Sequence, residues 1–283
     1  MAGGVQARET IELGDFARTR DLSPLAAAIR RMCAAANGAP VLGVCIGFPA
    51  NLDPDAAAIV SYAAMDIQQP TSFAQVFPAF WREVELPVYL ENDANLACEG
   101  EAFLRRGAGG AANMLYLSIG SGCGGAVRLD GKLRRGARCR AGEVGAMLLQ
   151  PALGAPGRSA ARETLEDAVC LAALERRFGA ALRDGAQPGE ASAQAMRDYL
   201  CGPLSGAVYS LVMTLDVELC VLAGIVPGAL GMQLCTQVSE ALRAALPEST
   251  PVRVEPSVSA DAGVIGAAAT VFERSLDALL GSG

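Results

Sequence analysis

The order of hydrophobic and polar residues predicts short buried strands that alternate with helices. Three continuous apolar runs are typical of strands covered on both faces, and they lie at 41–48 (VLGVCIGF), 86–92 (LPVYLEN) and 218–226 (ELCVLAGIV). A further strand is predicted at 251–256. Strands that recur between helices along the chain indicate an α/β architecture in two lobes.

The remaining segments are predicted from local signals. Residues 113–133 contain two strand-like runs around a glycine turn, and Asp130-Gly131 marks a second hairpin turn. Residues 5–13 alternate and predict an edge strand, whereas 49–75 is polar and predicts a loop. Helices are predicted at 22–36, at 76–85, from Asp93 onward, over most of 160–215, and in the stretches that follow the last two strands.

Length and composition limit the class of protein. The 283 residues exceed the usual size of one core, so two domains or one large α/β domain are expected. The 23 Lys and Arg against 30 Asp and Glu give a net charge of −7, which disfavours a nucleic-acid surface. We therefore expect neither nucleic acid nor membrane as a partner.

The chain contains no histidine. This excludes a Ser-His-Asp triad, a Cys-His pair and a histidine-ligated metal. A general base is then a carboxylate or, less favourably, Cys, Lys or Tyr.

Nine dispersed cysteines without a C-x-x-C pair are typical of reduced core cysteines in a cytoplasmic protein. The first sixteen residues lack the apolar core of a signal peptide. Residues 219–239 are uncharged and long enough to span a bilayer, but Pro227 and several glycines favour a strand, a turn and a helix start.

Asp93 is the most informative residue, because it follows a predicted buried strand and opens a helix. Ligands of α/β sheets bind at this edge, so Asp93 could accept a proton from a substrate hydroxyl that Asn92 also contacts. The alternative is that Asp93 only caps the helix, a frequent role of aspartate. Local sequence by itself favours the cap.

Other polar positions carry weaker signals, each with a structural alternative. The turn Gly120-Ser121-Gly122-Cys123-Gly124 could admit phosphate oxygens close to its backbone N–H groups, or could be a flexible hairpin. Glu143 could bind sugar hydroxyls or lie on the surface. Gly224, which ends a strand, could border a nucleotide. Gly263 and Gly266 predict close packing of the last helix.

The order of these motifs is more specific than any one of them. Asn92-Asp93, GSGCGG, AGEVG, LCVLAG and ADAGVIGAA together resemble the ROK family of sugar kinases, sugar-responsive repressors and related proteins, from about residue 41 to 268. The resemblance implies an actin-like ATPase (ribonuclease H-like) two-lobed fold that binds ATP and a sugar between its lobes.

The resemblance also implies roles for individual residues. Asp93 would be the general base, and Asn92, Glu143 and Glu166 would bind the sugar. The residues that hold ATP with Mg²⁺ would be Gly120, Ser121, Gly122, Gly124 and Gly224. The smaller lobe would comprise 1–90 with the last helix, 263–283, and the larger lobe 91–262. Family members commonly form homodimers.

The chain departs from the family pattern in the region of the zinc loop. Ala146 stands where the family has a histidine, and no cysteine occurs between Cys139 and Cys170. We therefore expect no structural zinc, and the segment that carries Glu166 must be ordered in another way. Pro49-Ala50 replaces the Pro-Gly of the sugar loop.

A second departure concerns phosphate binding. The family's Asp-x-Gly-x-Thr motif, which precedes the strand at 41–48, is not found in this sequence, and the helix-turn-helix of the family's repressors is also missing. Either the start is truncated or the chain is a degenerate, non-kinase member. The resemblance thus leaves two functions open: an ATP-dependent kinase of a hexose or amino sugar, or a non-catalytic sugar-binding regulator.

Overall fold

The chain folds into two compact units in the computed structural model, which describes residues 5–36, 38–107, 110–149, 163–179, 182 and 187–280. Unit 1 comprises Met1–Phe103, Gly136–Arg140 and Asp261–Gly283, and unit 2 comprises Leu104–Arg135 and Ala141–Ala260. Parts of the predicted helical stretch 160–215, including most of its predicted loop at 184–188, lie outside the described residues.

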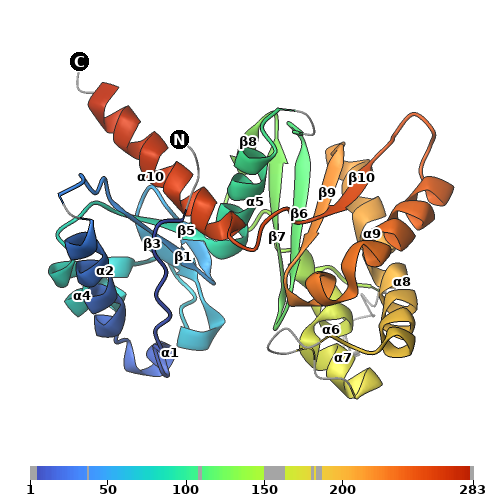
Figure 1. Ribbon diagram of the computed structural model, residues 1–283, viewed down its shortest axis with the longest axis horizontal. Helices are drawn as coiled ribbons and strands as arrows, with labels where there is room; N and C mark the ends of the chain where they lie inside the picture. The colour runs from blue at the N-terminus through green and yellow to red at the C-terminus, as the bar shows by residue number, and fades with distance from the viewer. Residues whose placement is uncertain are drawn as a thin grey trace. The chain divides into compact units, whose positions relative to one another are not determined.

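Unit 1 contains a parallel pair of strands and a small antiparallel sheet (Figure 1). Strands β1 (Val44–Phe48) and β5 (Val88–Asn92) pair in parallel with Phe48 opposite Asn92. The antiparallel sheet consists of β2 (Asn51–Asp53), β3 (Ala58–Ser61) and β4 (Thr71–Ser72). The helices are α1 (Phe16–Thr19), α2 (Ser23–Ala35), η1 (Ala63–Met65), α3 (Phe73–Val76), α4 (Pro78–Glu83), α5 (Asp93–Leu104) and α10 (Ala262–Leu280).

Two predictions for unit 1 are wrong. Residues 5–14 form no strand although their pattern alternates, because alternation produces a strand only where a neighbouring strand supplies hydrogen bonds. Residues 49–75 are not a loop, since they contain β2, β3 and β4. These strands have two to four residues, too few for a period-two pattern to stand out.

Phe48 is the centre of the aromatic core of unit 1. Its ring makes edge-to-face contacts with the rings of Phe16, Tyr62, Phe73 and Phe77, with centroids 5.3–6.0 Å apart. Such pairs prefer this geometry and contribute beyond their buried area. Because Phe48 ends β1 opposite Asn92, this packing also fixes the strand ends that precede Asp93.

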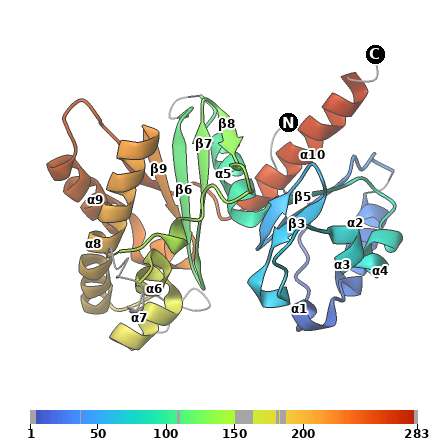
Figure 2. The same cartoon turned by 180° about the vertical axis from the view of Figure 1, so that it is seen from behind.

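Unit 2 is built on one mixed sheet in the order β10-β9-β6-β7-β8 (Figures 1 and 2). Strand β6 (Met114–Ile119) pairs in parallel with β9 (Leu219–Ala223), and antiparallel with β7 (Cys123–Leu129). The edge strands are β8 (Lys132–Arg134) and β10 (Arg253–Pro256). The remaining elements are η2 (Val144–Ala146), α6 (Leu165–Val169), α7 (Leu171–Phe178), α8 (Glu190–Leu215) and α9 (Ile225–Ala245).

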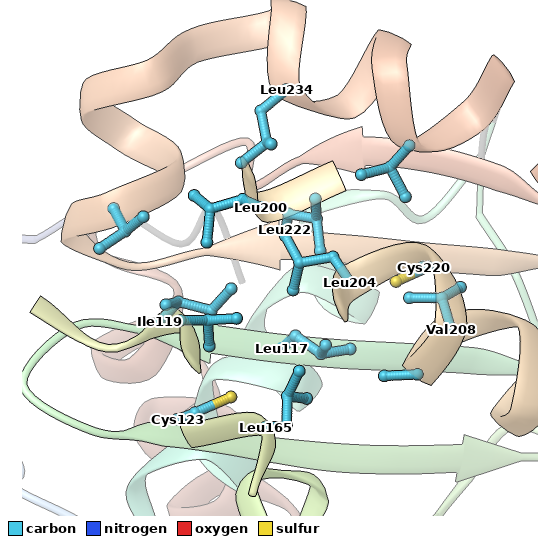
Figure 3. Packing of buried hydrophobic residues seen from close by; sticks show 14 of the residues in the cluster. Leu117, Ile119, Cys123, Leu165, Leu200, Leu204, Val208, Cys220, Leu222 and Leu234 are labelled. Carbon is cyan, nitrogen blue, oxygen red and sulfur yellow. The ribbon is translucent and has the colours of Figure 1, made fainter. Parts of the chain in front are cut away.

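The core of unit 2 lies between the sheet and α6, α8 and α9 (Figure 3). Leu117 and Ile119 of β6 and Leu222 of β9 pack against leucines of these helices. The helix residues labelled in Figure 3 are Leu165, Leu200, Leu204, Val208 and Leu234. All five residues of β9 are buried, as the continuous apolar run predicts.

The uncharged stretch at 219–239 is a strand and a helix. It comprises β9, Gly224 and most of α9, which is interrupted by the non-helical backbone of Gly231. Within the described parts of the chain, no helix combines the length and apolarity needed to cross a membrane.

Helices α5 and α10 approach each other closely within unit 1. A Cβ atom added to Gly266 would lie 1.8 Å from the carbonyl oxygen of Leu96, and one added to Gly100 would lie 1.8 Å from that of Ala262. The close packing predicted for the last helix is therefore confirmed at Gly266, whereas a Cβ at Gly263 would meet open space.

We expect the substitution Gly266→Ala to destabilise the protein by about 1–3 kcal/mol, since the added methyl group forces the two helix backbones apart. Thermal unfolding followed by circular dichroism measures the change. Gly263→Ala, in the same helix, is the matched control and should leave the melting temperature unchanged or slightly higher. Equal melting temperatures for the two variants would contradict the packing argument.

Candidate functional site

Asp93 begins helix α5 directly after the last residue of β5, at the carboxyl end of the parallel pair β1–β5. Its side chain is exposed, and its Oδ1 accepts a hydrogen bond from the N–H of Ala94 at 2.9 Å. The structure thus presents a carboxylate to solvent at the sheet edge where α/β folds bind ligands.

Asn92, rather than Asp93, caps helix α5. Its Oδ1 accepts hydrogen bonds from the N–H groups of Ala94 and Asn95 at 3.0 and 3.2 Å, and its Nδ2 donates to the carbonyl of Ala50 at 3.2 Å. The alternative that Asp93 serves as the N-cap is therefore wrong. Asparagine at this position satisfies the first helical N–H groups and leaves the next carboxylate available.

Two neighbours of Asp93 were not singled out by the sequence. Glu91 is 3% exposed, and its Oε1 accepts hydrogen bonds from the N–H of Asn92 and from Nδ2 of Asn95, which fixes the strand end. Burial raises the pKa of Tyr62, and the negative charge of Asp93 raises it further. Acidic and aromatic residues are too common for sequence alone to select either residue.

The glycine turn (residues 120–124) comprises the loop between β6 and β7 and the first two residues of β7, in unit 2. The N–H of Gly120 donates to the carbonyl of Gly122 at 2.9 Å, and Ser121 and Gly124 are exposed. A Cβ added to Gly120 would have no atom within 4 Å. A phosphate oxygen needs space to approach backbone N–H groups closely, and the open space at Gly120 meets this requirement.

Gly224 joins β9 to α9 beside the glycine turn. Its φ of +94° is in the left-handed region that favours glycine, and an added Cβ would lie 2.5 Å from the carbonyl oxygen of Ile119. Ile119 immediately precedes Gly120. The N-terminal end of α9 therefore lies against the start of the glycine turn. This is the arrangement expected if Gly224 borders a bound nucleotide.

Glu143 is exposed and directly precedes η2, which packs against β7. The next residue, Val144, is 3% exposed and belongs to the core of unit 2. A buried neighbour thus anchors the segment, while Glu143 itself is exposed.

Glu166 contacts the glycine turn directly. Its Oε2 accepts a hydrogen bond from the N–H of Cys123 at 2.8 Å, and on the other side of the turn the N–H of Leu171 donates to the carbonyl of Gly120 at 2.8 Å. Sequence reasoning placed Glu166 only at the sugar, so its contact with the turn is a new feature.

The segment that carries Glu166 is joined to the neighbouring part of the chain by hydrogen bonds. The N–H of Leu165 donates to Met147 O at 2.8 Å, and that of Leu149 donates to Glu163 O at 3.0 Å. Thr164 and Asp167 form a capping box at the start of α6, visible in the sequence as the pattern Thr-x-x-Asp but not singled out there. Hydrogen bonds to Thr164 lower the pKa of Asp167.

The described residues contain no group of three or more His, Cys, Asp or Glu that could hold a metal ion. In kinase sites, Mg²⁺ is bound largely by phosphate oxygens and waters, with one or two carboxylates, so such a group is not required. The structure thus gathers the glycine turn, Gly224 and Glu166 in unit 2, together with Glu143, whereas Asn92 and Asp93 belong to unit 1.

Comparisons with known proteins agree on one family. The model of the ROK family matches residues 10–274. The glucokinase of Halalkalibacterium halodurans is 34% identical over 141 residues, which are 47% of this chain and 40% of that protein. The xylose repressor of Caldicellulosiruptor bescii is 33% identical over 105 residues, which are 37% of this chain and 25% of that protein. The matched stretches thus span less than half of these relatives.

A solved structure shows the same fold. The ROK hexokinase of Thermus thermophilus superimposes with a TM-score of 0.68 at 26% identity, and the match covers 92% of this chain and 88% of that one. The α/β, actin-like ATPase fold predicted from the resemblance is therefore confirmed.

We expect Cys123 to resist alkylation by iodoacetamide at pH 8 in the folded protein. Burial raises the pKa of its thiol to about 12, and the charges of Glu166 and Cys170 add to this shift, so the reactive thiolate is scarce. Mass spectrometry of tryptic peptides measures the labelling rate, with the urea-unfolded protein as the control. Equal rates in the folded and unfolded protein would contradict the prediction, and labelling should accelerate as the pH rises toward the pKa.

Proposed function

Because the chain belongs to the ROK family, we propose that it transfers the γ-phosphoryl group of ATP to a hydroxyl group of a hexose or an amino sugar. The observation that carries this proposal is the exposed carboxylate of Asp93 at the end of a parallel strand pair, with its backbone fixed by Asn92 and Glu91. A phosphoryl acceptor requires a base that is accessible and also well positioned.

In the proposed reaction, Asp93 accepts the proton of the sugar hydroxyl as the oxygen attacks the γ-phosphorus. The bond from that phosphorus to the β,γ-bridging oxygen then breaks, and ADP leaves with the electron pair. The Tyr62 hydroxyl stays protonated, because burial and the charge of Asp93 both raise its pKa.

The glycine turn provides the phosphate contacts in this proposal. The exposed backbone at Ser121 offers an N–H group, and Ser121 adds a hydroxyl donor. Gly124 lies in β7 opposite Ser118 and has no side chain to restrict the approach of a phosphate. Gly224 borders the nucleotide at the end of β9. ATP arrives as its Mg²⁺ complex, in which the ion neutralises charge on the phosphates.

Sugar recognition is assigned to Asn92, Glu143 and Glu166. The carboxylates of Glu143 and Glu166 are exposed and accept hydrogen bonds from sugar hydroxyls. Asn92 has its Oδ1 occupied by two helix N–H groups, so its contribution to the sugar is the second N–H of Nδ2.

A second candidate function is sugar binding without phosphoryl transfer. The likeness to the xylose repressor favours it. A sugar that raises the melting temperature of the protein while ATP is not hydrolysed in its presence would identify this function.

The kinase proposal predicts that Asp93→Asn lowers kcat by about 10²–10⁴-fold, because the amide does not accept the sugar proton. A coupled assay of ADP release over glucose, N-acetylglucosamine, N-acetylmannosamine and fructose measures it. Binding of sugar and of a non-hydrolysable ATP analogue should be retained, since Asn has nearly the size of Asp.

Asp277→Asn on the exposed surface of α10 is the matched control, with the same chemical change outside the site, and should keep wild-type turnover. A wild-type protein that turns over none of the four sugars, or an Asp93→Asn variant as active as wild type, would refute the assignment.

A further inference from the structure

We propose that Glu166 is a positioning residue for the glycine turn, and that the affinity of the protein for ATP depends on it. This inference rests on the proposed kinase function and deepens it, because it assigns to a residue expected at the sugar a second role toward the nucleotide.

The contact has the geometry of a strong hydrogen bond. The distance from Cys123 N to Glu166 Oε2 is 2.8 Å, within the range of charge-assisted bonds, which are about twice as strong as neutral ones. The N–H of Cys123 lies at the junction of the turn and β7, so the carboxylate fixes the direction in which the turn leaves the sheet.

The carboxylate is also in close contact with the turn itself. A Cβ added to Gly122 would lie 2.9 Å from Oε2 of Glu166, which places the oxygen directly over the backbone of that residue. A larger side chain at position 122 would push the carboxylate away.

The backbone of Glu166 is held independently of this contact. Leu165 is bonded to Met147, Thr164 and Asp167 cap the helix, and Leu171 bonds Gly120 from the other side. Glu166 itself is exposed, so its carboxylate is not needed to fill the core. An exposed glutamate on a backbone held by other bonds can orient the turn without being required for folding.

The two oxygens of Glu166 then have different roles. Oε2 holds the N–H of Cys123, and among the described residues no hydrogen bond occupies Oε1. Oε1 is the atom that remains for a sugar hydroxyl, so one carboxylate serves both ligands.

An opposing effect makes the test decisive. A negative charge beside a phosphate site repels the nucleotide, so a purely electrostatic role predicts tighter ATP binding when Glu166 is replaced. A positioning role predicts weaker binding, because the turn loses the bond that orders it. The sign of the change distinguishes the two.

The experiment compares Glu166→Ala, Glu166→Gln and Gly122→Ala in the full chain. At saturating sugar, Glu166→Ala should raise the KM for ATP by about tenfold, the loss expected for a charge-assisted hydrogen bond. Glu166→Gln should restore most of the affinity, since its amide oxygen also accepts a hydrogen bond from Cys123. Glu163→Ala is the control, because it removes an exposed carboxylate from the same segment.

Gly122→Ala tests the contact from the other side, since it displaces the carboxylate without removing it. Its effect on the KM for ATP should not add to that of Glu166→Ala in the double variant, as expected when two changes break one contact. Hydrogen exchange at the amide of Cys123 should accelerate in both single variants and not in Glu163→Ala.

The outcomes separate this inference from the kinase proposal. If the wild-type protein binds no AMPPNP in calorimetry, both proposals are wrong. If it binds AMPPNP and Glu166→Ala binds equally or more tightly, the positioning role is wrong and the kinase proposal stands. If Glu166→Gln is as impaired as Glu166→Ala, the hydrogen bond to the turn is not the cause.

Discussion

The glycine turn of unit 2 depends on hydrogen bonds that the hairpin does not supply itself. A chain that exposes its N–H groups to a phosphate needs other contacts to fix its backbone, because glycine restricts the conformation least of all residues. Here α6 and α7 provide them: Glu166 accepts the N–H of Cys123, and Leu171 donates to the carbonyl of Gly120. These helices are themselves fixed by the core, where Leu165 packs beside Leu117 and Cys123 (Figure 3). The hydrophobic core of unit 2 therefore positions the turn through two hydrogen bonds.

The segment that carries Glu166 depends on hydrogen bonds in the same way. Backbone hydrogen bonds join 147–149 to 163–165, and the capping box of Thr164 and Asp167 starts α6. Each bond contributes on the order of 1 kcal/mol, so the segment is ordered only when several of these bonds form together. Cooperative ordering of this kind depends on the integrity of the core beneath it.

Sequence predicted best what depends on local pattern or on a specific order of motifs. The strands β1, β5 and β9 were visible as continuous apolar runs, but only β9 is buried throughout, whereas β1 and β5 are partly exposed. The resemblance that implied the fold came from five motifs in order. Strands β2, β3 and β4 were missed because their pairing partners, rather than their own residues, determine them. In the candidate site, the sequence indicated the positions but not the partners of the side chains: the cap at Asn92, the buried Glu91 and the bond from Cys123 to Glu166 all depend on three-dimensional contacts.

The division of roles between Asn92 and Asp93 follows from the chemistry of the two side chains. A helix N-terminus attracts negative charge, so an aspartate at the cap would be held there by two N–H groups and would become a weaker base. Asparagine satisfies the same N–H groups without charge, and Asp93 accepts, among the residues that the structure describes, the N–H of Ala94 alone. The buried carboxylate of Glu91 supports the backbone from below by accepting the N–H of Asn92. Three consecutive polar residues therefore occupy different environments: Glu91 is buried beneath the strand end, Asn92 caps the helix, and Asp93 is exposed to solvent.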